Sequence, residues 1–426
     1  MDNHQPISQA LGLIHPIVLE SGLNAEVWDQ QGKRYIDFVG GIGVLNLGHC
    51  HPEITQAIET QCKKLTHYAF NAAQHAPYLD FMQQLCAFIP VNYPVAGMLT
   101  NSGAEATENA LKVARSVTGR SGVIAFDGGF HGRTLAAVNL NGKVAPYKQQ
   151  LGVLPGPVYH IPYPSPDNEV TADEAYKALL RLFQVEIDVN NIAAVIFEPV
   201  LGEGGFHVMD QHFATQLQAF CRQHGILMIV DEIQSGFGRT GQPFAFSQLN
   251  LEPDLLLLGK SIAGGLPLGA LIGRAEYMHQ PNKGALGGTY LGNPIACAAG
   301  LATLKVMQSA AYQASAEHYV DTLNRYYQRW KNQNLTPWLG RLTGIGAMRG
   351  IELYHPEHGA GTQLLAQILQ QARQQGLLLM PSGQHKNIIR LLTPLTIEPE
   401  ILEEGLNILE QILAQTAQET LYQSIA

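Results

Sequence analysis

Two residues of opposite charge each follow an apolar run that is typical of a buried strand. Lys260 comes just after residues 255–258, in the glycine-rich segment LLLLGKSIAGGLPLGA, and Asp231 comes just after residues 226–230. In a parallel sheet both side chains would lie at the carboxyl edge, where ligands of α/β proteins bind. Pyridoxal phosphate requires such a pair, because a lysine forms its Schiff base and a carboxylate keeps its ring nitrogen protonated. The two segments therefore predict a pyridoxal phosphate site in an enzyme that handles amines.

Two further segments suit the same cofactor. Ser102 precedes the helical run AEATENALKVAR, and a helix N-terminus offers unpaired backbone N–H groups to a phosphate. Phe130 follows the turn Gly128-Gly129 and is a candidate to stack on the pyridine ring. Each feature also has an ordinary structural explanation: Ser102 as an N-cap, Phe130 as a core aromatic and Lys260 as a surface lysine. The prediction depends on their combination.

The elements that must position these residues alternate between strands and helices over residues 51–305. Apolar runs at residues 122–126 and 192–197 are typical of buried strands, like the two runs described above. The alternation predicts a mostly parallel sheet with helices on both faces. Residues 153–170 contain five prolines, so we expect an extended surface loop there instead of a helix or a central strand.

The two ends of the chain predict a smaller unit. Residues 25–29 and 35–39 alternate in polarity around a turn, which indicates a hairpin. After residue 305, amphipathic helical segments flank strand-like runs at 346–352 and 387–392. We therefore expect an α/β protein with three segments: an arm and hairpin at 1–50, a large cofactor-binding domain at 51–305, and a C-terminal small α+β domain at 306–426, which the first segment joins.

Composition argues against several classes of function. Hydrophobic residues make up 46% of the chain and charged residues 14%, with a net charge of −9, so we expect a compact enzyme and no nucleic acid partner. The five cysteines are scattered without a CxxC pair, so we expect no metal site and a reducing, cytoplasmic location. The sequence shows no signal peptide and no membrane-spanning apolar stretch, which predicts a soluble protein.

A set of motifs resembles the class III aminotransferases, pyridoxal phosphate enzymes of fold type I. The motifs are NSGAEATENA, FHGRT, EPVLGEGGF, DEIQSGFGRTG, GKSIAGGLPLGA and GGTYLGNPIA, and their order and spacing match over nearly the whole chain. Within the family, the branch that acts on 4-aminobutyrate is most similar. That similarity rests on IHPI at 14–17, GGIGVLNLGH at 40–49, GKVAPY at 142–147 and IIRLLTPLTI at 388–397.

The resemblance implies a role for each residue that matches a family motif. Lys260 would hold the cofactor covalently and then move the substrate proton, and Asp231 would pair with the pyridine nitrogen. The other implied cofactor contacts are Gln234 at the phenolic oxygen, Phe130 and Ile233 on the two ring faces, His131, the phosphate-binding residues Ser102, Gly103 and Ala104, and Gly288 and Thr289 from a second subunit.

Four residues are implied in substrate recognition. Arg133 would bind the distal carboxylate, and Arg390 the α-carboxylate of glutamate or 2-oxoglutarate, because guanidinium groups pair with carboxylates in a bidentate manner. Glu203 would cover Arg390 when a substrate without an α-carboxylate is bound. Ile42 would narrow the space above the ring. Phe130 departs from family members that carry tyrosine at this position.

The resemblance implies a ping-pong reaction in at least a homodimer. The amino group of 4-aminobutyrate, or of a similar ω-amino acid, would pass to 2-oxoglutarate, giving succinate semialdehyde and L-glutamate. Acetylornithine and ornithine aminotransferases share several of the motifs and stay open as alternatives. A class III racemase or epimerase would also use Lys260, although it has no second substrate that needs Glu203. A regulatory protein would need an output domain, and no helix-turn-helix pattern precedes residue 25.

Overall fold

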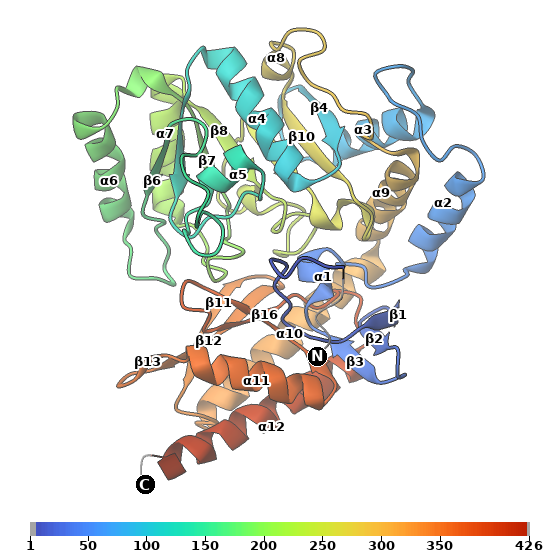
Figure 1. The fold of residues 1–426 in the computed structure, drawn as a ribbon, viewed down its shortest axis with the longest axis vertical. Helices are drawn as coiled ribbons and strands as arrows, with labels where there is room; N and C mark the ends of the chain where they lie inside the picture. The colour runs from blue at the N-terminus through green and yellow to red at the C-terminus, as the bar shows by residue number, and fades with distance from the viewer. Residues whose placement is uncertain (1–5, 424–426) are drawn as a thin grey trace.

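A large mixed sheet forms the centre of the protein (Figure 1). A computed structural model describes residues 6–423, so residues 1–5 of the predicted arm lie outside the described residues. The strands of this sheet are β4 (Val95–Thr100), β5 (Gly122–Phe126), β6 (Val158–Ile161), β7 (Ile192–Phe197), β8 (Leu227–Asp231), β9 (Leu255–Leu258) and β10 (Gly269–Arg274). Within residues 6–423 their order is β4-β10-β9-β8-β7-β5-β6, and β10 alone runs antiparallel to the others.

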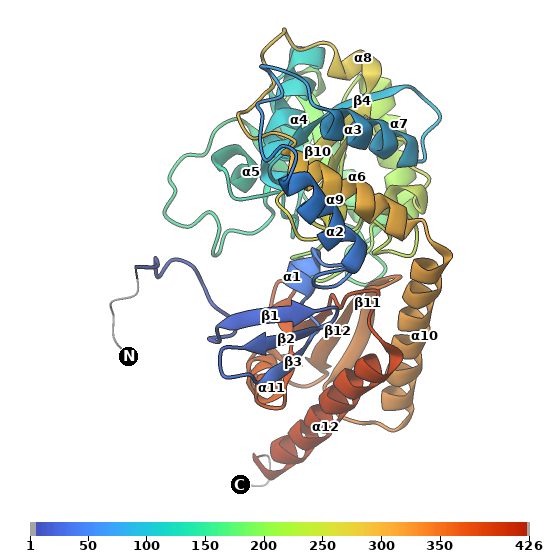
Figure 2. The same ribbon diagram turned by 90° about the vertical axis from the view of Figure 1, so that its right-hand side faces the viewer.

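Helices cover both faces of this sheet because its strands are apolar on both sides. The helices are α2 (Pro52–Cys62), α3 (Ala76–Phe88), α4 (Gly103–Thr118), α5 (Leu135–Leu140), α6 (Ala172–Val185), α7 (Gln211–His224), α8 (Ala275–Met278) and α9 (Pro294–Met307). Along β9, Leu255 and Leu257 pack with α4, whereas Leu256 and Leu258 pack in the cluster that includes α3, α7 and α9. Figure 2 shows the two helical layers. The predicted α/β architecture is confirmed.

The predicted strands of the large sheet agree closely with the structure. β5, β7 and β9 have the predicted bounds, and β8 is shifted by one residue, so that Asp231 is its last residue. One expectation was incomplete: the proline-rich stretch 153–170 contains the short strand β6, which pairs with β5 at the edge of the sheet. An edge strand tolerates nearby prolines, because only one of its sides needs backbone donors.

The two ends of the chain pack together beside the large sheet (Figure 1). The predicted hairpin is present as β2 (Glu26–Asp29) and β3 (Arg34–Asp37), extended by β1 (Leu19–Leu23) and by the C-terminal β14 (Leu377–Leu378). A second sheet contains β11 (Leu339–Ile345), β12 (Met348–His355), β13 (Gly359–Ala360), β15 (Met380–Ser382) and β16 (Ile388–Leu391). Its helices are α10 (Ala310–Asn332), α11 (Thr362–Gln374) and α12 (Pro399–Gln423). The domain boundaries at 50 and 305 stay predictions.

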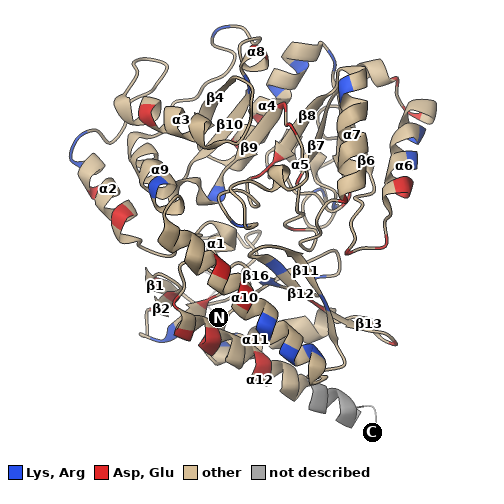
Figure 3. Cartoon of the chain, turned by 180° about the vertical axis from the view of Figure 1, so that it is seen from behind, with Lys and Arg blue, Asp and Glu red and all other residues tan. Residues whose placement is uncertain are grey.

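Charged residues of both signs are interspersed along outer helices such as α6 and α10 (Figure 3). This arrangement leaves the apolar faces of these helices for the core. Between residues 6 and 423, no helix is both long and apolar enough to span a bilayer.

A tight turn, α1 (Gly40–Gly43), connects the small sheet to the large one. All four of its residues have positive φ, between 51° and 74°, and Ile42 at 64° is unusual because β-branched residues disfavour this region. A Cβ on Gly40 would lie 2.2 Å from the Leu392 carbonyl oxygen, so only glycine fits there. The buried Arg239 fixes the adjoining loop, because its Nε donates to Asn46 Oδ1 at 3.0 Å and its Nη1 to the Thr393 carbonyl at 2.8 Å.

Candidate active site

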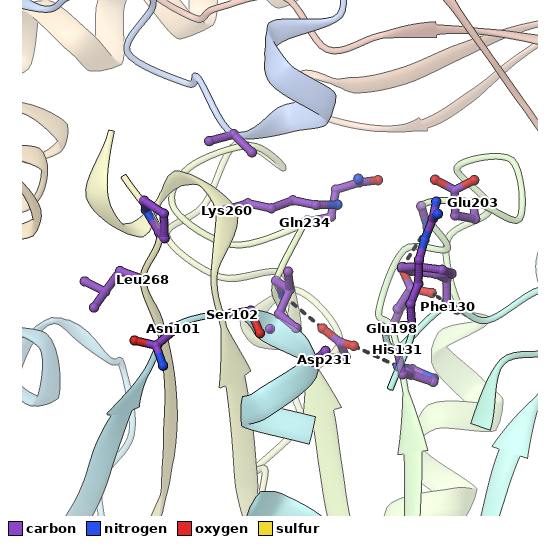
Figure 4. Close-up of a pocket in the computed structure, with 18 of the residues that line it drawn as sticks. Asn101, Ser102, Phe130, His131, Glu198, Glu203, Asp231, Gln234, Lys260 and Leu268 are labelled. Carbon is purple, nitrogen blue, oxygen red and sulfur yellow. Dashed lines mark hydrogen bonds and ion pairs between the residues drawn. The ribbon is translucent and has the colours of Figure 1, made fainter. Parts of the chain in front are cut away.

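A cavity of about 440 Å³ opens at the carboxyl ends of the parallel strands (Figure 4). Because those ends share one edge of the sheet, residues far apart in sequence meet there. The predicted site residues that line the cavity are Ser102, Gly103, Ala104, Phe130, His131, Arg133, Glu203, Asp231, Ile233, Gln234 and Lys260. The structure thus brings together most of the residues that the sequence motifs indicated.

Lys260 follows β9 as the first residue of a 3₁₀ turn, Lys260–Ala263. Its φ is 46°, a left-handed conformation that is costly for a residue with a side chain and that clusters at functional sites. The next residue fixes the turn, because Ser261 Oγ donates to the Gly43 carbonyl at 3.1 Å. Burial lowers the pKa of the Lys260 ammonium group to about 8. The amine can therefore become a neutral nucleophile near physiological pH.

Asp231 is held rigidly at the end of β8. Its carboxylate accepts a hydrogen bond from His131 Nδ1 at 2.7 Å and another from the Ile233 backbone N–H at 3.1 Å. Both side chains are buried, with 3% of Asp231 and none of His131 exposed. His131 therefore orients Asp231 from behind, and its implied direct contact with the cofactor stays a prediction.

The start of α4 also lines the cavity. Ser102 caps this helix, with its Oγ accepting from the Glu105 backbone N–H at 3.2 Å. A Cβ on Gly103 would lie 2.5 Å from Ile233 Cδ1, so the helix start lies close against the Ile233 side chain in the loop after β8. The unpaired N–H groups of this first turn suit a phosphate.

The two arginines that are predicted to bind substrate carboxylates lie in different surroundings. Arg390 in β16 is 1% exposed, and its Nη2 lies 2.6 Å from Glu203 Oε2. Burial raises the pKa of Glu203, but the charge and hydrogen bond of Arg390 outweigh this effect, so its pKa is lowered and the carboxylate is anionic. Arg133 is exposed at the cavity wall, and its Cζ lies 5.3 Å from the centroid of the Tyr147 ring.

Four predicted site residues do not line the cavity: Arg390, which reaches it through Glu203, and Ile42, Gly288 and Thr289. Ile42 is 40% exposed, with its carbonyl 3.5 Å from Gln234 Nε2, and Val44 of the same segment lines the cavity. Gly288 and Thr289 are exposed and lie outside the residues that line this chain's cavity. Their contribution to the site of a second subunit stays a prediction.

Sequence reasoning missed Glu198, a buried carboxylate after β7. Its Oε1 accepts from the Phe130 backbone N–H at 2.8 Å and its Oε2 from that of Gly202 at 2.9 Å, so it ties together the two loops that carry Phe130 and Glu203. Burial raises the pKa of Glu198 to about 7. The signal was available, because Glu198 follows an apolar run in the same way as Asp231.

Fold and site together define a fold type I enzyme that uses pyridoxal phosphate. Lys260, Asp231 and the start of α4 fit the aldehyde, the pyridine nitrogen and the phosphate of this cofactor. The family model for class III aminotransferases matches residues 9–413. The chain belongs to this family.

Individual relatives agree with this assignment. The chain is 62% identical over 413 residues to the 2-aminoadipate transaminase of Pseudomonas putida, covering 97% of this chain and 99% of that protein. It is 42% identical over 421 residues to the 4-aminobutyrate aminotransferase of Escherichia coli, with 97% of each covered. An amine transaminase from an uncultivated Pseudomonas species, solved with pyridoxal phosphate bound, superposes with a TM-score of 0.87 at 26% identity, covering 96% of this chain and 99% of the other.

Proposed function

We propose that this aminotransferase moves the amino group of 2-aminoadipate to 2-oxoglutarate, giving 2-oxoadipate and glutamate. The observation that carries the proposal is a pair of guanidinium groups: Arg133 lines the cavity, and Arg390 lies behind Glu203, a cavity residue with which it forms an ion pair. A dicarboxylic α-amino acid presents one carboxylate to each guanidinium, and bidentate pairing fixes its orientation. The 62% identity to a 2-aminoadipate transaminase supports this donor.

The residues of the chain divide the work of the reaction. When bound, pyridoxal phosphate supplies an electron sink for the bond that breaks at the amine carbon. Asp231, oriented by His131, keeps the pyridine nitrogen protonated. Lys260 Nζ takes the proton from the amine carbon and passes it to the cofactor instead of back to that carbon, a role that suits an amine whose pKa burial lowers to about 8. Arg133 and Arg390 hold the carbon chain in register with Lys260.

A second candidate donor is 4-aminobutyrate, with succinate semialdehyde and glutamate as products. The observation that favours it is the ion pair of 2.6 Å between Glu203 and Arg390. This pair neutralises Arg390 when the substrate has no α-carboxylate, so that no cation is left unpaired in the cavity. The 42% identity to a 4-aminobutyrate aminotransferase agrees with this role.

The working unit is proposed to be a homodimer in the cytoplasm. Apolar side chains are exposed along the N-terminal arm and beside Thr289, with Leu13 at 79% and Tyr290 at 62% exposure, as expected of surfaces that a second subunit covers. The five cysteines are free thiols, which suits a reducing compartment.

A panel of amino donors tests the proposal. The kcat/KM values of 2-aminoadipate, 4-aminobutyrate, 5-aminovalerate, ornithine and N-acetylornithine are measured with 2-oxoglutarate as acceptor. We expect 2-aminoadipate to exceed ornithine by at least roughly tenfold, because ornithine places an ammonium group where Arg133 requires a carboxylate. A preference for ornithine or N-acetylornithine would contradict the proposal, and a preference for 4-aminobutyrate would favour the second candidate. Racemisation without amino transfer would indicate a racemase.

A further inference from the structure

The segment GKVAPY at residues 142–147 carries a tyrosine that the proposed function does not use. Tyr147 is half-buried in the loop after α5 and lies against cavity residues. Its ring centroid lies 5.0 Å from that of Phe130, with an angle of 55° between the planes, and 5.3 Å from Arg133 Cζ. Its hydroxyl lies 3.4 Å from Glu203 Oε2. One side chain therefore contacts both parts of the substrate-recognition apparatus.

The hydroxyl and Arg390 bind the same oxygen atom. Glu203 Oε2 accepts from Arg390 Nη2 at 2.6 Å and from the Tyr147 hydroxyl at 3.4 Å. Burial and the nearby Glu203 raise the pKa of Tyr147, so its hydroxyl remains a donor over the whole physiological range. A second donor on this oxygen stabilises the position of Glu203 over Arg390.

The aromatic ring of Tyr147 contacts Arg133, the arginine that is proposed to bind the distal carboxylate. Arg133 is exposed, and a guanidinium at 5.3 Å from an aromatic centroid is within cation–π distance. This contact restricts the rotamers of a long side chain that would otherwise sample solvent. The ring thereby positions the guanidinium that receives the distal carboxylate.

We propose that Tyr147 is a specificity-determining residue, whose hydroxyl holds Glu203 on Arg390 and whose ring positions Arg133. The hydroxyl thus sets the balance between substrates with and without an α-carboxylate, since a carboxylate reaches Arg390 only after Glu203 moves away. This inference rests on the proposed function, in which Arg390 receives the α-carboxylate.

The hydroxyl and the ring of Tyr147 can be tested separately with two carboxylic acids that bind but do not react. Glutarate has two carboxylates and needs both arginines, whereas butyrate has one and needs only Arg133. Their dissociation constants are measured by calorimetry on the holoenzyme and on its variants. In Tyr147→Phe, which keeps the ring, we expect glutarate to bind about threefold to tenfold more tightly, because Glu203 is released more easily, and butyrate to be unchanged. In Tyr147→Leu, butyrate should bind about threefold more weakly, because the cation–π contact is lost.

Two controls keep the outcome specific. Tyr327→Phe removes a hydroxyl that donates to the Gly340 carbonyl in the small domain, and it should change neither dissociation constant. In a Glu203→Gln background the effect of Tyr147→Phe on glutarate should shrink to less than about twofold, as a double-mutant cycle requires for coupled residues.

The failures are distinguishable. If wild type binds glutarate no better than butyrate, the two-arginine scheme of the proposed function is wrong and the inference falls with it. If wild type prefers glutarate but Tyr147→Phe changes both acids equally or neither, the inference alone is overturned. Persistence of the full effect in the Glu203→Gln background would also overturn it, because the hydroxyl would then act through another group.

Discussion

Replacing Glu203 by glutamine removes the charge that neutralises Arg390 in the cavity. Arg390 is 1% exposed, and besides Glu203 its guanidinium donates from Nε to the Pro381 carbonyl at 2.9 Å. Breaking a buried ion pair costs about 3–5 kcal/mol, and the 26% exposure of Glu203 reduces this to about 2 kcal/mol. A monocarboxylic ω-amino acid leaves Arg390 unpaired in the variant, so its kcat/KM should fall by roughly 30-fold.

Dicarboxylic substrates should escape most of this loss, because their own α-carboxylate pairs with Arg390. Single-turnover rates with 4-aminobutyrate and with glutamate, measured on wild type and Glu203→Gln, give the specificity ratio directly. Glu252→Gln is a matched control, since Glu252 forms an exposed pair with Arg222 at 2.6 Å. An equal loss for both amines would refute the reasoning, because Glu203 would then support the site in general.

Three other perturbations test separate parts of the site. Asp231→Asn should lower the half-reaction rate at least about 100-fold with the fold intact, because an amide cannot stabilise a protonated pyridine; unchanged rates would exclude this role. The rate at which apoenzyme attaches pyridoxal phosphate should rise with pH through a midpoint near 8, because burial lowers the pKa of Lys260 to that value. A midpoint near 10 would show that burial does not lower the pKa of Lys260. Burial raises the pKa of Glu232 to about 7, so its stabilising contribution is present below pH 4.5 and is lost as pH rises through 7. Glu232→Gln keeps an acceptor for the Phe246 backbone N–H and a partner for Ser235. It should therefore reduce the fall in Tm between pH 5.5 and 8. If the fall in Tm is unchanged, other groups cause it.

Local signals in the sequence were sufficient to find the residues at strand ends. An apolar run that stops at a charged residue placed Asp231 and Lys260 at the sheet edge, because the end of a buried strand is where polar groups first become accessible. The Ser102 cap was predicted in the same way, from a small polar residue before an amphipathic helix.

Contacts between loops that are distant in the sequence could not be predicted from a local pattern. The pairing of His131 with Asp231 and the two hydrogen bonds of Glu198 depend on the path of the chain between strands, which no local pattern encodes. Arg239 illustrates the same limit: a buried guanidinium that binds Asn46 and the Thr393 carbonyl contradicts the expectation that arginines lie at the surface. Only the assembled fold supplies its partners.

The most direct test of the account is the chemical location of the cofactor. Holoenzyme is reduced with borohydride, digested and analysed by mass spectrometry, in parallel with Lys260→Ala. We predict that the peptide containing Lys260 alone carries the pyridoxyl phosphate mass, and that Lys260→Ala binds the cofactor without a covalent bond and does not turn over, because Asp231 and the start of α4 remain. Label on a different lysine, or turnover by Lys260→Ala at near the wild-type rate, would contradict the central assignment.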